Sequence, residues 1–554
     1  MLFHPRYGHL HVIALLTLSG CHSNDGERET VLQAAVSQAS LSEFAAHVED
    51  LRMRLEIPSL SAGIVRDGDL VWAKGFGYAD PEEGVPATPE TPYHLASLTK
   101  TFTSTIMLQL VEEGRISLDD SIAKYGIDIG TSGDVRLRHL LSHTSDDPPG
   151  SFFRYDGNRF GTLGTVIEQV TGKPLWEAVQ ERIVSPLELT TTVPGDAPDT
   201  YPDVFAALAR PYEFDESHTM VVGEYPVYFD ASAGLISTVT DLARFVSALG
   251  NGELLSPAME ELAFTPNRTT DGEQIPYGFG WFSQEYRGVR LVWAFGYWFC
   301  NSSLMLTLPD QGLTLIALAN TDGLSSPFPI GLADALVIES PLALEFLRSF
   351  VLDATFPDGT PTIDWSQPPH AIVNRLRTVV DSGEREFIET EIRGRWAVAN
   401  HVGNRGEADR YLDVFYESFG LNDDDVFGGM PELARIDSVR FGDDRTADFD
   451  LRKDTRVRIY AIGDGPPWSA MFDDVWIENA ATRDTLWMMH GTETVAAGGH
   501  MRNRKADLHM DLPAGRYRLH FKKTVFAHSW DQWEVFPPTH RFLGAVVLNA
   551  EDGA

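Results

Sequence analysis

Basic residues are scarce in this chain. Its 554 residues include 44 lysines and arginines against 80 aspartates and glutamates, which gives a formal net charge of -36 at pH 7. A field of this sign repels phosphate, so nucleic acid is excluded as a partner. The charge does not define a small-molecule substrate. Because 43% of the residues are hydrophobic, the composition is still that of a globular protein with a full core.

Cysteine is rarer still, and Cys21 and Cys300 are the only two. Two cysteines exclude a disulfide framework. Cys21 ends a short segment with a basic start, a brief apolar run and small residues before the cysteine, which is typical of a secretory signal peptide. This run is too short for a transmembrane helix, which needs about 20 apolar residues, and no other run is long enough.

The four residues Leu18-Ser19-Gly20-Cys21 resemble the bacterial lipobox, whose cysteine is lipidated and becomes the mature N-terminus. An ordinary signal peptide with an incidental cysteine is the alternative. The resemblance implies a lipid-anchored protein of the bacterial cell envelope, held to a membrane by lipidated Cys21. With His22 rather than aspartate after the cysteine, it points to an outer-membrane or periplasmic location.

A serine and a lysine stand three residues apart in Ser97-Leu98-Thr99-Lys100, at the start of an apolar run over 102–111 that predicts a helix. Residues at this spacing share one face of a helix, about one turn apart. A serine hydroxyl is a poor nucleophile without an adjacent base, which the lysine supplies here. Four-residue patterns recur by chance, so a surface serine beside a solvated lysine is the alternative.

The Ser-x-x-Lys pattern resembles that of penicillin-binding proteins and serine β-lactamases, including the related esterases. Further segments resemble this family in the same order, namely a helix from about Leu41, a hairpin around Asp67-Gly68, and the stretches 138–145, 153–164 and 233–242. The resemblance implies an α/β (α+β) fold, in which helices flank an antiparallel sheet and a helical subdomain is added.

In this family the catalytic residues would be Ser97, Lys100 and Tyr155, since Tyr155 falls on the family's tyrosine when residues are counted back from Gly164. The tyrosine, held partly ionised by the lysine, would relay a proton to the leaving group. Gly157 replaces the family's asparagine, and Asn158 stands one place late. Asn158 therefore either turns into the substrate site or only shapes the loop.

The family's third motif, Lys-Thr-Gly or His-x-Gly, corresponds to Ala294-Phe295-Gly296. The resemblance implies an oxyanion hole made by the backbone N–H groups of Ser97 and Tyr297. Gly296 is expected to let the substrate backbone approach. Ala294 replaces a cation that helps to hold a substrate carboxylate, so a neutral ester or amide is favoured over penicillin.

Two histidines, His139 and His143, invite a metal or catalytic role. No acidic or histidine partner stands at ligand spacing, so we predict that both are structural. The acidic runs at 423–425 and 443–444 suit calcium chemically, but solvated loops explain them better in so acidic a chain. The sequence therefore predicts neither a metal site nor a cofactor.

The family pattern stops at about Val351. Apolar runs such as 372–376 then predict a helical spacer, and alternating β-rich segments follow. These segments predict a C-terminal β-sandwich of ordinary domain size. Such a sandwich could bind a glycan or another surface ligand, although its aromatic residues could equally be core. The predicted segments are a lipoprotein signal peptide (1–21), a tether (22–40), the hydrolase domain (41–351), a helical spacer (352–435) and a β-sandwich (436–554).

The sequence thus predicts a secreted, lipid-anchored serine hydrolase that acts on a small-molecule or peptide acyl substrate. Two other hypotheses remain. One is a degenerate hydrolase that serves as a binding or scaffold lipoprotein, suggested by Ala294 and Gly157. The other is a true β-lactamase, which Ala294 disfavours.

Overall fold

The computed structural model describes residues 37–550 except for ten short gaps, which are 216, 329–335, 357–358, 380, 440–441, 466–469, 499–502, 524–539, 541 and 543. Cys21 and the predicted signal peptide therefore lie outside the described residues. Within the described part of the chain, no helix is both long enough and apolar enough to cross a bilayer.

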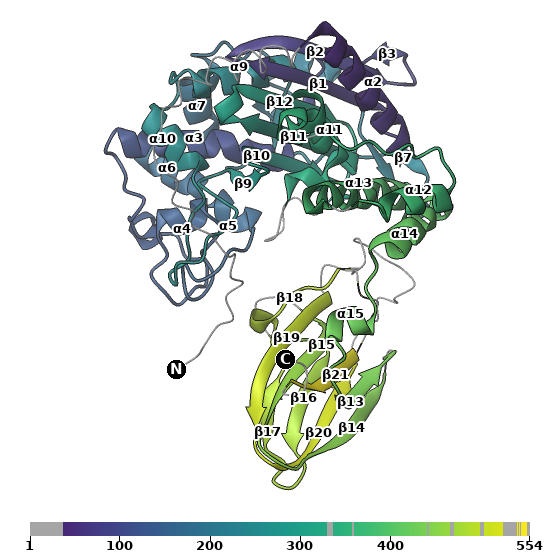
Figure 1. The fold of residues 1–554 in the computed structure, drawn as a ribbon. Helices are drawn as coiled ribbons and strands as arrows, with labels where there is room; N and C mark the ends of the chain where they lie inside the picture. Colours follow the sequence, from purple (N-terminus) through teal and green to yellow (C-terminus); the bar gives the residue numbers. More distant parts are fainter. Residues whose placement is uncertain are drawn as a thin grey trace, which may run out of the picture.

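A seven-stranded sheet organises the N-terminal three fifths of the chain (Figure 1). Its order is β3-β2-β1-β12-β11-β10-β9, and its paired strands are antiparallel. The strands are β1 (Ser59–Arg66), β2 (Asp69–Asp80), β3 (Val85–Pro86), β9 (Phe282–Tyr286), β10 (Val289–Trp298), β11 (Asn301–Leu308) and β12 (Leu313–Ala319). Pairing of β1 with β12 joins the beginning of the domain to its end.

Helices cover both faces of this sheet, because its central strands alternate two sets of apolar side chains. One set forms a core with α2 (Gln38–Arg54) and α11 (Pro341–Phe350). The other set forms a second core with α3 (Lys100–Glu112) and α9 (Val239–Gly250). The predicted antiparallel sheet flanked by helices is confirmed.

The helical subdomain lies beside α3 (Figure 1). It contains α4 (Leu137–Leu141), α5 (Gly157–Gly161), α6 (Leu163–Thr171) and α7 (Leu175–Val179). A long connection follows, with α8 (Pro202–Ala207) and the small hairpin β6 (Tyr212–Phe214) and β7 (Met220–Val222). The chain returns through β8 (Leu235–Ser237), which pairs with β4 (Tyr93–His94) and β5 (Val193–Pro194), and then through α9 and α10 (Pro257–Phe264).

The segment predicted as a spacer is helical, but it does not stand apart from the hydrolase. It forms α12 (Pro369–Leu376), α13 (Ser382–His401) and α14 (Arg405–Phe419). Buried side chains of all three helices belong to the same apolar core as α2, α11 and one face of the sheet. The apolar core thus continues past the predicted boundary at 351 into the helices that follow, and the boundary itself stays a prediction.

The C-terminal part is a β-sandwich, as predicted, preceded by the short helix α15 (Asp423–Phe427). One sheet has the order β13-β21-β15-β19-β18 and the other β14-β20-β16-β17. The strands are β13 (Glu432–Asp437), β14 (Asp444–Leu451), β15 (Thr455–Asp464), β16 (Asp474–Asn479), β17 (Thr485–Met488), β18 (Val495–Ala496), β19 (Asn503–Leu512), β20 (Gly515–Lys522) and β21 (Gly544–Asn549). Figure 1 shows this unit beyond α14, away from the seven-stranded sheet.

Candidate active site

Ser97 and Lys100 meet where a 3₁₀ turn, Ala96–Thr99, runs into α3. The Lys100 ammonium Nζ donates hydrogen bonds to Ser97 Oγ and to the Ser232 carbonyl oxygen, each at 3.0 Å. Lys100 is only 2% exposed, whereas Ser97 is partly exposed. The structure therefore places a buried amine against the hydroxyl of an accessible serine, which is the arrangement that an activated nucleophile needs.

The turn before Ser97 is held by neighbouring strands rather than by its own helix. Asn301 Nδ2 donates to the His94 carbonyl at 3.1 Å, and Ser303 Oγ donates to the Leu95 carbonyl at 2.9 Å. Ala96 takes a positive φ of 46°, which is costly for a residue with a Cβ. Strain next to a serine that is fixed from two sides is typical of a site where the direction of the side chain matters.

Gly296 lies on β10 directly against this turn. A Cβ at position 296 would stand 2.1 Å from the Leu95 carbonyl oxygen and 2.8 Å from the Ser97 nitrogen. The space where a side chain would lie is taken by the protein's own backbone, and the expectation that Gly296 also lets substrate approach stays a prediction. Glycine here lets β10 approach Ser97 and brings Tyr297, the second predicted oxyanion residue, next to the serine.

One edge of β10 has no strand partner beside Ser97, although residues 294–296 are buried there and only Tyr297 and Trp298 are exposed. Strand β9 pairs with β10 only as far as the pair Phe282–Trp293, so in the described chain residues 294–298 have a strand partner on the β11 side alone. An unpaired edge presents backbone N–H and C=O groups to an extended ligand. The acyl part of a substrate bound at Ser97 can therefore lie along this edge.

Tyr155 lies near the pair through its ring. The Lys100 ammonium is 5.0 Å from the ring centroid, and the ring packs against His143 at 4.3 Å and Phe282 at 5.9 Å between centroids. Among the described residues, its hydroxyl makes no hydrogen bond to Ser97 or Lys100. Catalytic hydrogen bonds are often long in free enzymes and tighten with substrate, so this geometry is compatible with the predicted role of Tyr155.

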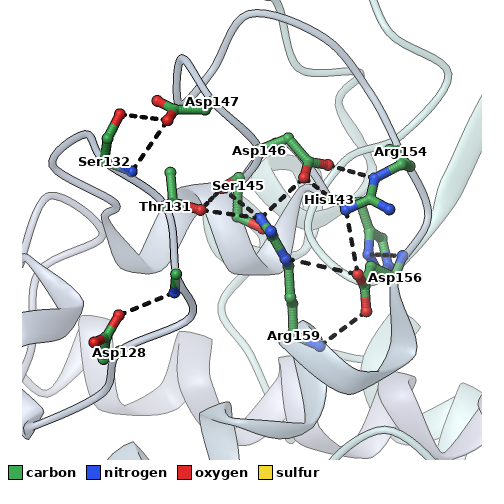
Figure 2. A network of polar contacts seen from close by, with 11 residues as sticks. Asp128, Thr131, Ser132, His143, Ser145, Asp146, Asp147, Arg154, Asp156 and Arg159 are labelled. Carbon is green, nitrogen blue, oxygen red and sulfur yellow. Dashed lines mark hydrogen bonds and ion pairs between the residues drawn. The ribbon is translucent and has the colours of Figure 1, made fainter. Parts of the chain in front are cut away.

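A network of charges fixes the loop that carries Tyr155 (Figure 2). Asp146 accepts hydrogen bonds from the Arg154 guanidinium at 2.5 and 2.6 Å and forms an ion pair with Arg159 at 3.1 Å. Asp156, which replaces the family's serine, forms ion pairs with the same two arginines at 3.6 Å and caps α5 by accepting from the Arg159 N–H. The substitution is thus compensated by two arginines that sequence reasoning missed, although both stand within four residues of Tyr155.

The missing asparagine leaves an open position next to Lys100. A Cβ at Gly157 would lie 3.6 Å from Lys100 Nζ and 3.8 Å from Ser232 Oγ, which is ordinary van der Waals contact. Asn158, by contrast, is exposed on α5. Of the two alternatives for Asn158, the structure favours a role in the loop over one in the site.

Ala294 is buried rather than open to substrate. Its side chain belongs to the apolar core beneath the sheet, opposite Met305 on β11. The prediction that Ala294 borders the substrate stays a prediction, and its small buried side chain supplies no cation near Ser97.

Ser232 was not predicted, although its carbonyl is one of the two hydrogen-bond acceptors of Lys100. It stands one residue before the stretch 233–242 that resembles the family, so its position in the sequence was the available signal. Asp230 holds the segment by accepting from the Ser232 N–H at 2.6 Å and the Ser232 hydroxyl at 2.8 Å. The segment 230–232 therefore positions Lys100.

His143 packs beneath the candidate site, and its structural role stays a prediction. Its Nδ1 accepts from the Asp156 N–H at 3.1 Å, and its ring is buried against Tyr155 and Phe160. Burial and the nearby Lys100 charge lower the pKa of His143 well below its usual value. The imidazole therefore stays neutral beneath the site, and the groups of three or more residues that a metal ion needs are absent from the described residues.

We expect acid to destabilise the protein through its buried histidines. Burial lowers the pKa of His94 and of His401 to about 4, and it lowers that of His143 well below its usual value. Each gains a proton on unfolding below about pH 6.5, so the free energy of unfolding falls as the pH drops. Asp322, whose pKa burial raises to about 6, opposes this, as do Asp241, Glu260 and Glu345, whose pKa values burial raises as well. The melting temperature should fall by several degrees between pH 7 and pH 5.

Circular dichroism melts at both pH values check this expectation. His94→Asn should lower the melting temperature at pH 7 but reduce its dependence on pH. An unchanged or rising melting temperature at pH 5 would contradict the role of the histidines.

Residues 44–337 match the family model described as Beta-lactamase. The chain belongs to the beta-lactamase family. The predicted family membership is thus confirmed, and its members include hydrolases of several kinds. The match ends before α11, so α12–α14 and the sandwich lie beyond it.

Two curated relatives show the range of this similarity. The chain is 29% identical over 302 residues to "Penicillin-binding protein 4*" of Bacillus subtilis (strain 168), covering 46% of this chain and 66% of that protein. It is 26% identical over 303 residues to "Protein flp" of Staphylococcus aureus (strain MW2), covering 48% and 60%. The chain thus spans slightly less than two thirds of the length of these relatives.

Among solved structures, an octameric penicillin-binding protein homologue from Pyrococcus abyssi is similar at a TM-score of 0.48 and 24% identity, covering 55% of this chain and 77% of that one. The structure of EstCE1, described as a hydrolase with promiscuous acyltransferase activity, is similar at a TM-score of 0.43 and 22% identity, covering 54% and 99%.

Proposed function

We propose that this protein is a serine hydrolase that forms an acyl-enzyme at Ser97 and acts on a neutral ester or amide. The observation that carries the proposal is the 3.0 Å hydrogen bond between the buried Lys100 amine and the partly exposed Ser97 hydroxyl. Membership of the beta-lactamase family supports the same chemistry.

The reaction would proceed in two halves. Ser97 Oγ attacks the acyl carbon and gives its proton to the neutral form of Lys100, while the backbone N–H groups of Ser97 and Tyr297 donate to the oxyanion. The bond to the leaving group breaks as that group takes a proton through Lys100 or Tyr155. Water then attacks the acyl-enzyme, loses a proton to the same groups and regenerates the Ser97 hydroxyl.

A neutral substrate is favoured because two polar groups of the family are missing. Ala294 provides no cation for a substrate carboxylate, and Gly157 provides no side-chain amide. Charge-assisted hydrogen bonds are roughly twice as strong as neutral ones, so the loss of a cation weighs most on an anionic substrate. A penicillin, which carries such a carboxylate, should therefore be a poor substrate.

A fluorophosphonate probe tests the proposal, because it reports an activated serine without knowledge of the substrate. Wild-type protein should be labelled, and mass spectrometry should place the label on the peptide that contains Ser97. Absence of labelling would favour the alternative of a degenerate hydrolase that serves as a scaffold.

We expect Gly157→Asn to shift selectivity toward amides and β-lactams. With its Cβ 3.6 Å from Lys100 Nζ, the new side chain can accept from the lysine and donate to a substrate carbonyl. The ratio of kcat/KM for nitrocefin to that for p-nitrophenyl acetate should rise about tenfold, which corresponds to one hydrogen bond.

Gly157→Ala is the matched control, because it fills the same space without an amide. An unchanged ratio in Gly157→Asn, or an equal change in both variants, would show that the missing amide does not set selectivity.

We also propose that the mature protein is lipid-anchored at Cys21 in the cell envelope. The support is the lipobox-like sequence before Cys21. Cys21→Ser should move the protein from the membrane fraction to the soluble fraction, or leave the precursor uncut. One acyl chain anchors only marginally, so we expect a multiply acylated cysteine.

Mass spectrometry of the purified membrane fraction checks this expectation. An unmodified mature N-terminus at another residue would contradict it.

A further inference from the structure

Large apolar side chains are exposed around the mouth of the candidate active site. Two come from the end of β10, one from the turn after it, one from the end of β7 and two from the connection between β7 and β8. They are Tyr297, Trp298 and Phe299, with Val222, Val227 and Tyr228, and we call them the apolar rim. Each is between 43% and 74% exposed. Contiguous exposed apolar surface on a folded protein usually marks a ligand or interaction site.

The β10 side of the rim faces the nucleophile. Trp298 pairs with Asn301, just as Gly296 pairs with Ser303, and residues directly opposite each other share a sheet face. Asn301 donates to the His94 carbonyl, and Gly296 abuts the Ser97 backbone. Trp298 therefore lies on the face of β10 that looks toward the serine turn. It follows Tyr297, the predicted oxyanion residue.

The opposite side of the rim is tied to the catalytic lysine. Cys300 Sγ donates to the Glu224 carbonyl at 3.2 Å. This hydrogen bond joins the β10–β11 turn to the start of the connection between β7 and β8. The Tyr228 hydroxyl donates to Asp230, and Asp230 accepts from Ser232, whose carbonyl accepts from Lys100. The rim thus runs from the turn at Phe299 to Tyr228, which is linked to Lys100 by hydrogen bonds through Asp230 and Ser232.

We propose that the apolar rim binds the acyl group of the substrate, so that the preferred substrates are esters of medium-chain or aromatic acids rather than acetates. This inference rests on the proposed function, because the acyl carbon must sit at Ser97. The acyl group leaves Ser97 toward the exposed end of β10, where it meets Trp298 and Phe299. Binding pockets for such groups are lined mainly by aromatic and apolar side chains.

Chain length of the substrate provides the test. Each methylene taken out of water is worth about fourfold in binding, so p-nitrophenyl octanoate, below its micelle concentration, should exceed the acetate in kcat/KM by at least about tenfold. Trp298→Ser and Phe299→Ser should each lower the octanoate-to-acetate ratio severalfold, and Trp298→Phe should retain most of it. Met488→Ser, which changes a 51% exposed side chain of the sandwich, should leave the ratio unchanged.

The outcomes separate the two levels of the argument. If acetate is hydrolysed and the ratio is near one in wild type, or is unchanged in both rim variants, the acyl-binding role is wrong while the proposed function stands. If neither acetate turnover nor fluorophosphonate labelling is found, the proposed function fails and this inference fails with it. If the rim variants keep the ratio but lose binding to phosphatidylcholine vesicles, the rim is a membrane contact and the acyl-binding role is overturned.

Discussion

Ser97→Ala is expected to lower kcat/KM for p-nitrophenyl acetate by on the order of 10⁴-fold and to abolish fluorophosphonate labelling. The alanine removes the oxygen that forms the acyl-enzyme but leaves the oxyanion donors and Lys100 in place. The backbone should not change, because the turn is held by Asn301 and Ser303 and not by the Ser97 side chain. Initial rates with purified protein at equal concentration give the comparison.

A surface serine offers the matched control. Ser42→Ala on α2 changes the same group about as conservatively, far along the chain from the site, and should leave turnover within experimental error. Similar melting temperatures for both variants would exclude misfolding as the cause of lost activity. Turnover by Ser97→Ala equal to that of wild type would place the nucleophile elsewhere or remove the enzyme hypothesis altogether.

Gly296→Ala is expected to lower kcat/KM by about 10²-fold although alanine carries no reactive group. Its Cβ would stand 2.1 Å from the Leu95 carbonyl oxygen, so β10 or the serine turn must move apart. A misplacement of about 1 Å can cost 10²-fold in rate. The two predicted oxyanion donors, the N–H groups of Ser97 and Tyr297, lie on opposite sides of the contact between Gly296 and the serine turn. The distance between them should therefore increase most.

Gly406→Ala is the control for this substitution, since nothing lies within 4 Å of a Cβ at that position on α14. It should keep full activity and stability. Retained activity in Gly296→Ala would mean that β10 can shift without harm. A large fall in melting temperature without loss of specific activity would make Gly296 a folding requirement only.

Local sequence rules were sufficient for the elements near Ser97. The Ser-x-x-Lys spacing and the apolar run after it predicted both the helix and the meeting of the two side chains, because three-residue spacing on a helix has one geometry. The place of Tyr155 near Lys100 followed from the resemblance to the family and not from a local rule. What the rules could not provide was the conformation of the Tyr155 side chain and the two arginines that fix its loop. The contacts of the two arginines depend on Asp146, which is distant from both in sequence and lies in a loop of irregular backbone.

The sequence also could not predict what surrounds Gly296 and Ala294. Gly296 and Ala294 were both assigned to the substrate, because a motif gives residue types but not what faces them. The structure sets Gly296 against the Leu95 carbonyl and buries Ala294 in the core. The glycan or surface ligand predicted for the sandwich stays a prediction.

The core shared by the sheet and α12–α14 limits where this chain could be divided without exposing apolar side chains. A chain divided at Val351 would lose α12–α14, which cover apolar side chains of α2 and α11. The exposed core would favour aggregation. Past Gly420 the situation reverses, because Phe427 of α15 packs on Tyr460 of the sandwich rather than on the preceding helices. The boundary between the two hydrophobic interiors therefore lies at about Gly420, and a chain divided there would leave neither interior exposed.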